Sequence, residues 1–376
     1  MNFDSLAASV VVTGFPGRVP GPDALALIDR GVAGVILFSE NLGSPAEIAE
    51  LTCVLKRRAA RPFLLSVDQE GGRVARLRDG FTPLPPMRAL GQANDPALAE
   101  RFGRLLAEEC RAVGFDLDFA PVADVDSNPG NPVIGDRSFG RSPEVCGMLG
   151  AALVRGLQGG GVAACAKHFP GHGDTVQDSH RTLPRLPHDL ARLSRVELPP
   201  FAACVGAGVA AIMTAHVVFS ALDADLPATL SPRVLALLST ALGFSGVTIS
   251  DDLEMAAIAD RFPIGEAAVR AVAAGCDLLL VCHRPDRQAA VIDELRRWAE
   301  SSATAADRLR RAAEKVEALR NRWAAPPAGF DPKRLRRPTA LALARRLGVK
   351  PSGEDPTDAK ERPEPGASRP WFGVRR

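Results

Sequence analysis

The sequence lacks a strong net charge of either sign. Its 376 residues hold 46 lysines and arginines against 44 aspartates and glutamates, a formal net charge of +2. A nucleic-acid-binding domain normally carries a clear basic excess, so this balance argues against a nucleic-acid partner. The small excess is also uneven, because residues 325–376 carry 12 basic against 6 acidic side chains, whereas residues 1–324 carry 34 against 38. We therefore expect a mildly acidic body and a basic tail.

Long apolar runs and export signals are also missing. No stretch reaches the roughly 18 uncharged apolar residues that a membrane-spanning helix needs. The start, Met1–Ser5, has no basic region ahead of its short apolar run and no nearby cysteine to carry a lipid. The cysteines are odd in number and widely scattered, at positions 53, 110, 146, 165, 204, 276 and 282. This pattern is typical of reduced core residues, so we expect a cytoplasmic protein without a membrane partner.

A glycine-rich fingerprint after the first predicted strand is absent, although strands and helices alternate along the chain. Short apolar runs predict strands at Ser9–Thr13, Gly34–Phe38, Phe63–Val67, Asp116–Ala120, Val162–Ala166, Ala211–Ala215, Gly246–Ile249 and Leu278–Val281. Helical periodicity separates them at Pro22–Arg30, Pro45–Ala59, Pro96–Val113, Pro143–Gln158, Arg195–Gly206, Pro232–Leu242, Gly265–Ala274 and Pro285–Ala299. Strict alternation of this kind indicates parallel strands joined by helices.

The alternation predicts an α/β fold, a (β/α)8 TIM-type barrel over residues 1 to about 300. Such a barrel holds its strand–helix pairs in about 250 to 300 residues, whereas an open doubly wound sheet, the alternative, usually carries the missing fingerprint. Residues 303–324 have the spacing of one more amphipathic helix, so we expect a single catalytic domain at 1–324. The remainder has nine prolines in 52 residues. It predicts a disordered Pro/Arg-rich tail at 325–376, or alternatively a docking segment.

Titratable residues follow five consecutive predicted strands. They are Asp68–Arg73, then Asp124, Asp126 and Arg137, then Lys167 and His168, then His216, and finally Ser250–Asp252. Active sites of TIM barrels lie at the carboxyl ends of the strands. We therefore expect these side chains to meet at one end of the barrel.

The densest of these groups lies at residues 163–180. Three of the chain's six histidines fall there, directly after the apolar run that ends at Ala166. Pro170 stops further strand pairing, and Gly171 and Gly173 allow backbone angles that other residues resist. We expect a strand that ends at Ala166 and, from Lys167 on, a tight loop that carries the chemistry.

The segment Lys167–His180 resembles the signature Lys-His-Phe-Pro-Gly-His-Gly-x-Thr-x-x-Asp-Ser-His of the β-N-acetylhexosaminidases of glycoside hydrolase family 3, and every fixed position matches. The resemblance extends to Val67–Leu77, Gly135–Gly140 and Ser250–Met255, in the family's order. It covers residues 1 to about 300. It implies the same barrel and a glycosidase that needs neither a metal nor an organic cofactor.

The resemblance also implies the catalytic residues. The family's nucleophile is the aspartate that follows serine on the seventh strand, here Asp251, which would attack the anomeric carbon in a retaining, two-step hydrolysis. Its acid/base is a histidine on the loop after the fifth strand, here His180, paired with Asp178. An imidazole suits this role because its ordinary pKa, about 6.5, lets it give and take a proton at neutral pH. Asp252 is expected to support the nucleophile or to cap a helix.

Five further residues are assigned by the resemblance to the N-acetylglucosamine ring: Asp68 as an acceptor, and Arg76, Arg137, Lys167 and His168 as donors. We expect Glu70 and Arg73 to form ion pairs within their loop. His172 is expected to shape the turn between Pro170 and Gly173. His216 and Met213 either line the pocket or belong to the core.

Two other classes of protein stay open. A zinc hydrolase could use several of these histidines, although the HxH and HExxH spacings are absent. A sugar-binding protein without activity would be expected to lack Asp251 or His180. The missing export signal and the reduced cysteines favour a cytoplasmic enzyme that removes N-acetylglucosamine from muropeptides carrying anhydro-muramic acid. We expect it to be a monomer. Water is the expected acceptor, with a phosphorylase as the alternative because a neutral imidazole does not repel phosphate.

Overall fold

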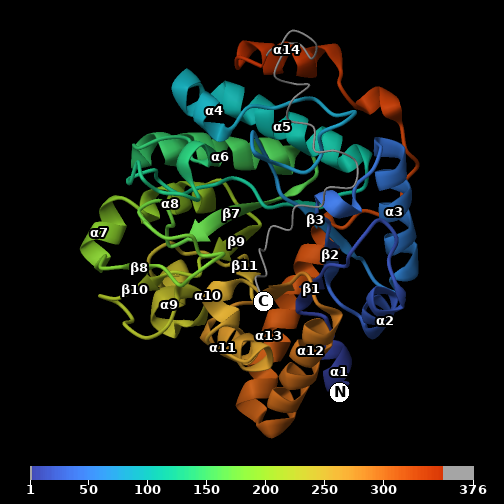
Figure 1. Ribbon diagram of the computed structural model, residues 1–376, viewed down its shortest axis with the longest axis vertical. Helices are drawn as coiled ribbons and strands as arrows, with labels where there is room; N and C mark the ends of the chain where they lie inside the picture. Colours follow the sequence, from blue (N-terminus) through green and yellow to red (C-terminus); the bar gives the residue numbers. More distant parts are fainter. Residues whose placement is uncertain (1, 350–376) are drawn as a thin grey trace.

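The computed structural model describes residues 2–349 and shows a closed barrel of parallel strands (Figure 1). The strands follow one another around the barrel in the order β1-β12-β11-β9-β7-β6-β3-β2. Their bounds are β1 Val11–Thr13, β2 Gly34–Ile36, β3 Leu64–Val67, β6 Leu117–Asp118, β7 Ala163–Phe169, β9 Ala211–Thr214, β11 Val247–Asp252 and β12 Leu278–Val281. The predicted (β/α)8 barrel is confirmed.

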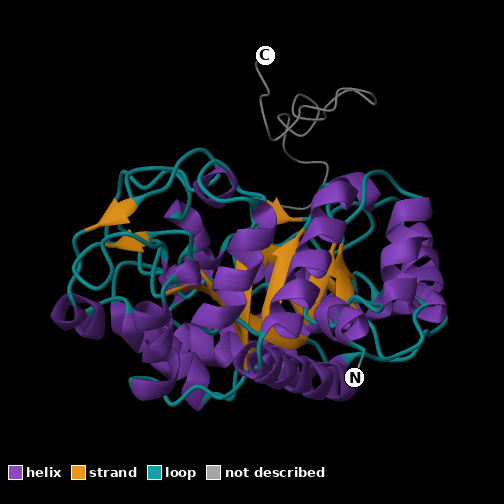
Figure 2. Ribbon diagram, turned by 90° about the horizontal axis from the view of Figure 1, so that it is seen from below, coloured by secondary structure: helices purple, strands orange, loops and turns teal. Residues whose placement is uncertain are grey.

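Helices surround the strands on all sides, as Figure 2 shows from below. The helices that connect successive strands are α2 Pro22–Arg30, α3 Pro45–Arg58, α5 Pro96–Ala112, α6 Pro143–Gly159, α8 Leu198–Gly206, α9 Pro232–Thr240 and α11 Ile264–Ala274, and α12 Pro285–Ser301 follows the last strand. Further helices and turns are α1 Phe3–Ala8, η1 Ser39–Asn41, α4 Met87–Ala93, η2 Gly135–Arg137, α7 Leu190–Arg195, η3 Ala228–Leu230, α10 Ala256–Ala259, α13 Ala303–Trp323, η4 Pro332–Arg334 and α14 Pro338–Arg346.

Several helices begin at a capping side chain followed by proline. The hydroxyl of Ser44 accepts the backbone N–H of Glu47, whose carboxylate in turn accepts the N–H of Ser44 at 2.7 Å. Asp95, Ser142 and Ser231 cap α5, α6 and α9 in a similar way. Proline fits the first helical turn because its missing N–H would have no partner there. These local signals explain why the helix starts could be predicted closely.

Alternate strand residues point to opposite sides of the barrel wall. Leu64 belongs to the inner apolar cluster, and its neighbour Leu65 packs outward against the helices. Val316 and Leu319 of α13 join the inner cluster, and Lys315 donates to the carbonyl of Gly246, just before β11. Helix α13 therefore covers the amino-terminal end of the barrel and leaves the carboxyl end for the site.

Two strands run further than predicted, and both carry site residues. β7 continues through Lys167 and His168 to Phe169, with a register shift against β9 after Ala166. β11 continues through Asp251 to Asp252, with a register shift against β12 after Ile249. The prediction that the loop begins at Lys167 was wrong, because the polar side chains there find partners on other strands.

The short elements beyond the strand ends also differ from the prediction. After β3, β4 Gln69–Gly71 and β5 Val74–Ala75 form an antiparallel ribbon, and β8 Arg185–Leu186 pairs with β10 Val218–Phe219. The predicted helix Arg195–Gly206 is two helices, α7 and α8, because Pro199 and Pro200 can stand only in the first turn of a new helix.

The chain beyond residue 324 is partly ordered. Residues 325–349 contain η4 and α14, and Leu335, Ala340, Ala344 and Leu347 are buried. Arg346 lies 3.1 Å from Asp95, which caps α5, and α14 lies beside that helix in Figure 1. The prediction of disorder is therefore wrong for 325–349, where a few apolar side chains suffice to dock the segment. Residues 350–376 lie outside the described part.

The cysteines behave as predicted within residues 2–349. All seven are free thiols. Cys53 is partly exposed, and the other six are buried. Burial raises the pKa of the Cys146 thiol to about 11 and that of the Cys204 thiol to about 12.

Candidate active site

Asp251, the expected nucleophile, lies near the carboxyl end of β11. One oxygen of its carboxylate accepts the backbone N–H of Asp252 at 2.8 Å. Burial would raise the pKa of this carboxyl, but the nearby imidazoles of His216, His168 and His180 outweigh burial and hold the pKa below its usual value. Asp251 is therefore an ionised carboxylate at neutral pH, the form that a nucleophile needs.

His180 and Asp178 form the contact that the sequence predicts. The Nδ1 atom of His180 lies 2.7 Å from Oδ1 of Asp178, and the same oxygen accepts the backbone N–H of His180 at 2.9 Å. Burial would raise the pKa of Asp178, but these hydrogen bonds lower it below its usual value. The His180 side chain is 39% exposed, so it is open to a substrate. Asp178 thus orients the ring through Nδ1, and Nε2 is the nitrogen that the expected proton transfer would use.

His172 holds the loop that carries His180. Its Nε2 lies 2.9 Å from the hydroxyl of Ser179, and its Nδ1 lies 2.9 Å from the hydroxyl of Thr175. The amide of Asn131 donates to its carbonyl at 2.8 Å. Burial lowers the pKa of His172 to about 4, so the ring is neutral at pH 7. As expected, His172 shapes the loop, and it does so next to the acid/base residue.

Lys167 is the centre of an ion cluster at the carboxyl ends of β3 and β7. Its Nζ lies 2.7 Å from Asp68 and 2.7 Å from Glu70. Arg137 donates two hydrogen bonds to Glu70, at 2.9 and 2.8 Å, and Arg76 lies 3.7 Å from Asp68. Four of the five predicted binding residues are thus linked in one network of ion pairs with the buried Glu70.

This cluster stays charged at neutral pH. Burial would raise the pKa of Glu70, but Arg137 and Lys167 hold it well below its usual value. Burial would lower the pKa of Lys167, but Asp68 and Glu70 raise it above its usual value. Among the side chains that the structure describes, the buried Nε of Arg76 finds no acceptor. Arg76 therefore has a donor available for a ligand.

Glu70 and Arg73 form ion pairs as expected, but with partners from other loops. Glu70, after β3, pairs with Arg137 from the segment after the neighbouring strand β6, and Arg73 lies 2.9 Å from Asp136 of the same segment, so the prediction of pairs within their own loop was wrong. The sequence of one loop cannot indicate these partners, because they lie 63 and 67 residues away along the chain.

His168, the fifth predicted binding residue, is held by Asp124. Nδ1 of His168 lies 2.7 Å from Oδ2 of this fully buried carboxylate. Burial would raise the pKa of Asp124, but the neighbouring His168 lowers it below its usual value. The sequence placed Asp124 at a strand exit without a role, and the hydrogen bond to His168 supplies one.

His216 and Met213 belong to the core, one of the two predicted alternatives. Both are buried, and Met213 packs in the inner barrel cluster. Nε2 of His216 lies 3.0 Å from the carbonyl oxygen of Asp252, and Nδ1 lies 2.7 Å from the hydroxyl of Thr229. A ring nitrogen beside a carbonyl must donate, so His216 supports the backbone directly after Asp251.

Two further groups near the site gave no clear sequence signal. Nε2 of His283, after β12, lies 3.2 Å from Asp252, and its ring stacks on Phe38 at a centroid distance of 5.1 Å. Asp118 is fully buried on β6, and burial raises the pKa of its carboxyl well above the usual value. The side chain of Asp252 thus contacts His283 at the carboxyl end of the barrel.

Within residues 2–349, no group of three or more His, Cys, Asp or Glu side chains is placed to hold a metal ion. No helix in the same range is long and apolar enough to cross a membrane.

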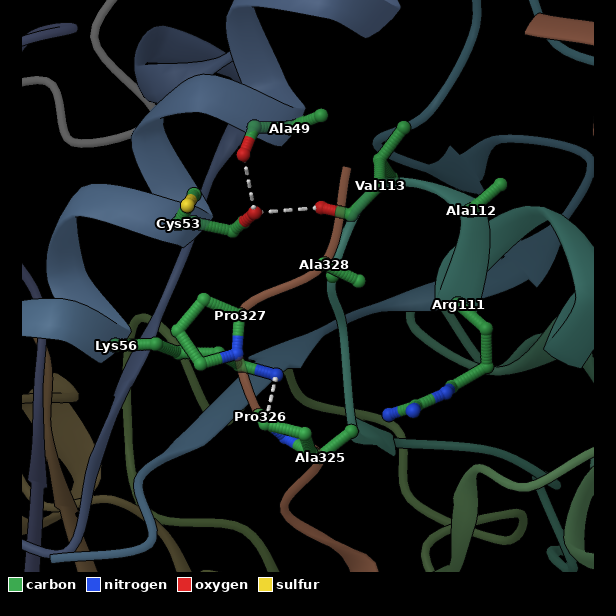
Figure 3. Close-up of a pocket in the computed structure, with 12 residues that line it drawn as sticks. Ala49, Cys53, Lys56, Arg111, Ala112, Val113, Ala325, Pro326, Pro327 and Ala328 are labelled. Atoms are coloured by element: carbon green, nitrogen blue, oxygen red, sulfur yellow. Dashed lines mark hydrogen bonds between the residues drawn. The ribbon is translucent and has the colours of Figure 1, made fainter. Parts of the chain in front are cut away.

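A small cavity lies at the amino-terminal end of the barrel (Figure 3). It is bounded by α3, the end of α5 and residues 325–328, and Lys56 donates to the carbonyl of Ala325 at its edge. Its volume of about 20 Å³ leaves room for roughly one water molecule. The cavity is too small for a sugar, so the carboxyl end of the barrel remains the candidate site.

Comparison with known sequences points to one family. The sequence model of the glycosyl hydrolase family 3 N-terminal domain matches residues 22–319. The chain is 45% identical over 280 residues to a β-hexosaminidase of Thiobacillus denitrificans, covering 73% of this chain and 77% of that one. It is 44% identical over 288 residues to a β-hexosaminidase of Neisseria meningitidis serogroup C, covering 74% and 78%.

Solved structures agree with the sequence comparison. A family 3 β-N-acetylglucosaminidase from Paenibacillus sp. superposes with a TM-score of 0.88 at 43% identity, covering 92% of this chain and 68% of that one. NagZ from Neisseria gonorrhoeae, in complex with N-trifluoroacetyl-D-glucosamine, superposes with a TM-score of 0.75 at 34% identity, covering 90% and 96%. The chain therefore belongs to glycosyl hydrolase family 3 and resembles the β-hexosaminidases of that family.

Proposed function

We propose that the protein is an exo-acting β-N-acetylglucosaminidase that works by a retaining, two-step mechanism. The main support is that Asp251 is ionised and that the Asp178–His180 pair lies at the same end of the barrel. In the first step Asp251 forms a bond to the anomeric carbon while His180 gives its Nε2 proton to the leaving oxygen. In the second step His180 takes a proton from water, which releases the sugar from Asp251 with its original anomeric configuration.

The test is to trap the intermediate. A fluorinated N-acetylglucosaminide with a good leaving group slows the second step, and peptide mapping then locates the covalent sugar. We expect the label on Asp251. Asp252→Asn should still be labelled there, whereas a label on any other residue would overturn the assignment.

The sugar-binding role is proposed for the ion cluster and His168. Asp68 accepts from sugar hydroxyls, and Arg76, Arg137, Lys167 and His168 complete the contacts. The unbonded Nε of Arg76 supports this role, and so does the relative whose structure holds N-trifluoroacetyl-D-glucosamine. Arg137 is committed to Glu70 by two hydrogen bonds, so we propose that it acts on the sugar mainly through its charge.

We propose peptidoglycan fragments as the substrate and the cytoplasm as the location. The protein would remove the non-reducing N-acetylglucosamine from muropeptides that carry anhydro-muramic acid, as a monomer and without a cofactor. Comparing kcat/KM on such muropeptides with kcat/KM on chitobiose tests this choice. A clear preference for chitobiose would contradict it, and so would recovery of the protein outside the cytoplasm.

Water is proposed as the acceptor, although His180 gives a specific reason to test phosphate. A neutral imidazole does not repel an incoming anion, but the ionised Asp178 lies 2.7 Å behind it. We therefore expect hydrolysis to dominate. Formation of N-acetylglucosamine 1-phosphate in phosphate buffer would identify a phosphorylase instead.

A further inference from the structure

We propose that Asp124 is a positioning residue for the reaction, because it fixes both the ring of His168 and the start of the loop that carries His180. The inference rests on the proposed function, in which His168 contacts the sugar. Asp124 does not touch the substrate in this scheme. It acts through the groups that hydrogen-bond to its carboxylate.

The carboxylate of Asp124 accepts hydrogen bonds from three N–H groups of His168 and His172. Its Oδ2 receives Nδ1 of His168 at 2.7 Å, and both oxygens lie 3.2 Å from the backbone N–H of His168. Its Oδ1 also receives the backbone N–H of His172 at 2.7 Å. Asp124 is fully buried, so water does not compete for these bonds.

These contacts decide which nitrogen of His168 faces the site. A carboxylate only accepts hydrogen bonds when ionised, so Nδ1 of His168 must carry a proton. Nε2 is then the ring nitrogen that Asp124 does not hold. Without Asp124, the proton could move to Nε2 and the ring could turn, so the sugar would meet a different hydrogen-bonding partner.

Two contacts of His172 link Asp124 to the loop that carries His180. The N–H of His172 binds the same carboxylate, and the ring of His172 binds Ser179, the residue before His180. A chain of hydrogen bonds therefore runs from Asp124 through His172 to the position next to the acid. The buried carboxylate of Asp124 thus fixes both His168 on β7 and the start of the loop that carries His180.

The main test replaces Asp124 by asparagine, which keeps the shape of the side chain. An amide cannot accept all of these N–H groups, because its NH2 end would face a donor. We expect kcat/KM to fall about 10- to 100-fold, by analogy with the loss of the carboxylate behind a metal-binding histidine. We also expect weaker binding of N-acetylglucosamine in calorimetry and a changed pH profile of kcat/KM.

Asp126→Asn is the matched control. Asp126 lies two residues away and is equally buried, but it pairs with Arg88 at 2.7 Å and contacts no imidazole. A general loss of packing would affect both variants alike. We expect Asp126→Asn to lower stability while the pH profile and N-acetylglucosamine binding stay close to the wild type. Equal effects of the two variants on these readouts would overturn the proposal.

A spectroscopic readout is independent of activity. With histidine labelled by 15N, His168 of the wild-type protein should show a protonated Nδ1 and a single tautomer across neutral pH, assigned by its loss in His168→Asn. Asp124→Asn should change this signal. A wild-type ring that exchanges between tautomers would overturn the proposal even if the variant fails to fold. If the wild type neither binds N-acetylglucosamine nor cleaves its glycosides, the proposed function fails, and the spectrum still decides the role of Asp124.

Discussion

His172 and His180 lie on one loop, eight residues apart, and their surroundings give them opposite properties. His172 is 2% exposed, with both ring nitrogens bonded to hydroxyl groups. His180 has a side chain 39% exposed, and its Nδ1 lies beside the carboxylate of Asp178. A ring that is buried and neutral stabilises the loop, and a ring that is open and backed by an anion can transfer protons. This difference supports the proposal that His180, and not His172, transfers the proton.

The role of His180 predicts a dependence on the leaving group. His180→Ala should lower kcat/KM for disaccharide substrates about 10²- to 10⁴-fold, because their departing oxygen needs a proton. The nitrophenolate of a nitrophenyl glycoside departs with little protonation, so kcat/KM for these substrates should fall far less. Asp251→Ala should abolish both, and Val176→Ala, at an exposed position of the same loop, should change neither. Equal losses on the two substrates for His180→Ala would show that it is not the acid.

The buried, neutral His172 predicts a pH-dependent stability. Its pKa is 6.5 when unfolded and about 4 when folded. Between these values the unfolded chain binds more protons, so the free energy of unfolding decreases as the pH falls from 6.5 to 4. The contribution is fully present above pH 6.5 and amounts to roughly 3 kcal/mol. Urea unfolding should therefore show a gap between wild type and His172→Gln that narrows at acid pH. A constant gap would mean that another group titrates.

At the scale of elements, the site depends on close packing between the loop after β7 and the loop after β6. A Cβ atom on Gly173 would lie 1.7 Å from the carbonyl oxygen of Val125, a contact that backbone cannot relieve without moving. Gly173 is thus required by the approach of two loops, not by its own backbone angles. The distance between these loops sets where His180 stands.

Gly173→Ala should consequently displace the loop and lower kcat by about 100-fold, the cost of a misplacement near 1 Å. KM should change little, because the ion cluster around Lys167 does not contact this glycine. Gly140→Ala is the control, since a Cβ there meets nothing within 4 Å. Steady-state kinetics of both variants decide the point, and a wild-type kcat for Gly173→Ala would contradict the close approach.

The elements could be predicted as far as their signals are local. Helix starts carry Ser or Asp caps with proline, and buried strands carry apolar runs, so the barrel and the ends of most helices followed from the sequence. The extension of β7 through Lys167 could not be predicted, because its polar side chains are stabilised by Asp68 and Glu70 from another strand. The same reason hid the role of Asp124. The motif at 167–180 indicated the identity of the site residues but not the hydrogen bonds behind them.

At the scale of the whole molecule, the two ends of the barrel have separate tasks. Asp116, at the start of β6, is fully buried and binds Lys56 at 2.8 Å and Arg111 at 2.7 Å. It also accepts the backbone N–H of Ala325 at 3.0 Å, which fastens the chain beyond α13 to the barrel. The candidate active site lies at the carboxyl end of the barrel, and the ion pairs of Asp116 with Lys56 and Arg111 stabilise the amino-terminal end.

Asp116→Asn should therefore affect stability without affecting catalysis. Two cations would lose their buried partner, at a cost of roughly 3–5 kcal/mol in the free energy of unfolding. The kcat of the folded enzyme should stay unchanged, since the change lies at the far end of the barrel. Asp29→Asn removes the surface partner of Arg58 and should leave stability nearly unchanged. A large fall in kcat for Asp116→Asn at a temperature where it is folded would contradict the separation of the two ends.

The burial of the thiols makes this chain suited to selective chemical labelling. Alkylating reagents attack the thiolate, and burial keeps cysteines such as Cys146 and Cys204 protonated and out of reach. Cys53, partly exposed on α3, lines the small cavity beside residues 325–328. Among the cysteines of residues 2–349, a maleimide dye should therefore attach there first. The dye would report when the segment after α13 detaches from the barrel, while the sugar-binding mouth at the opposite end stays unmodified.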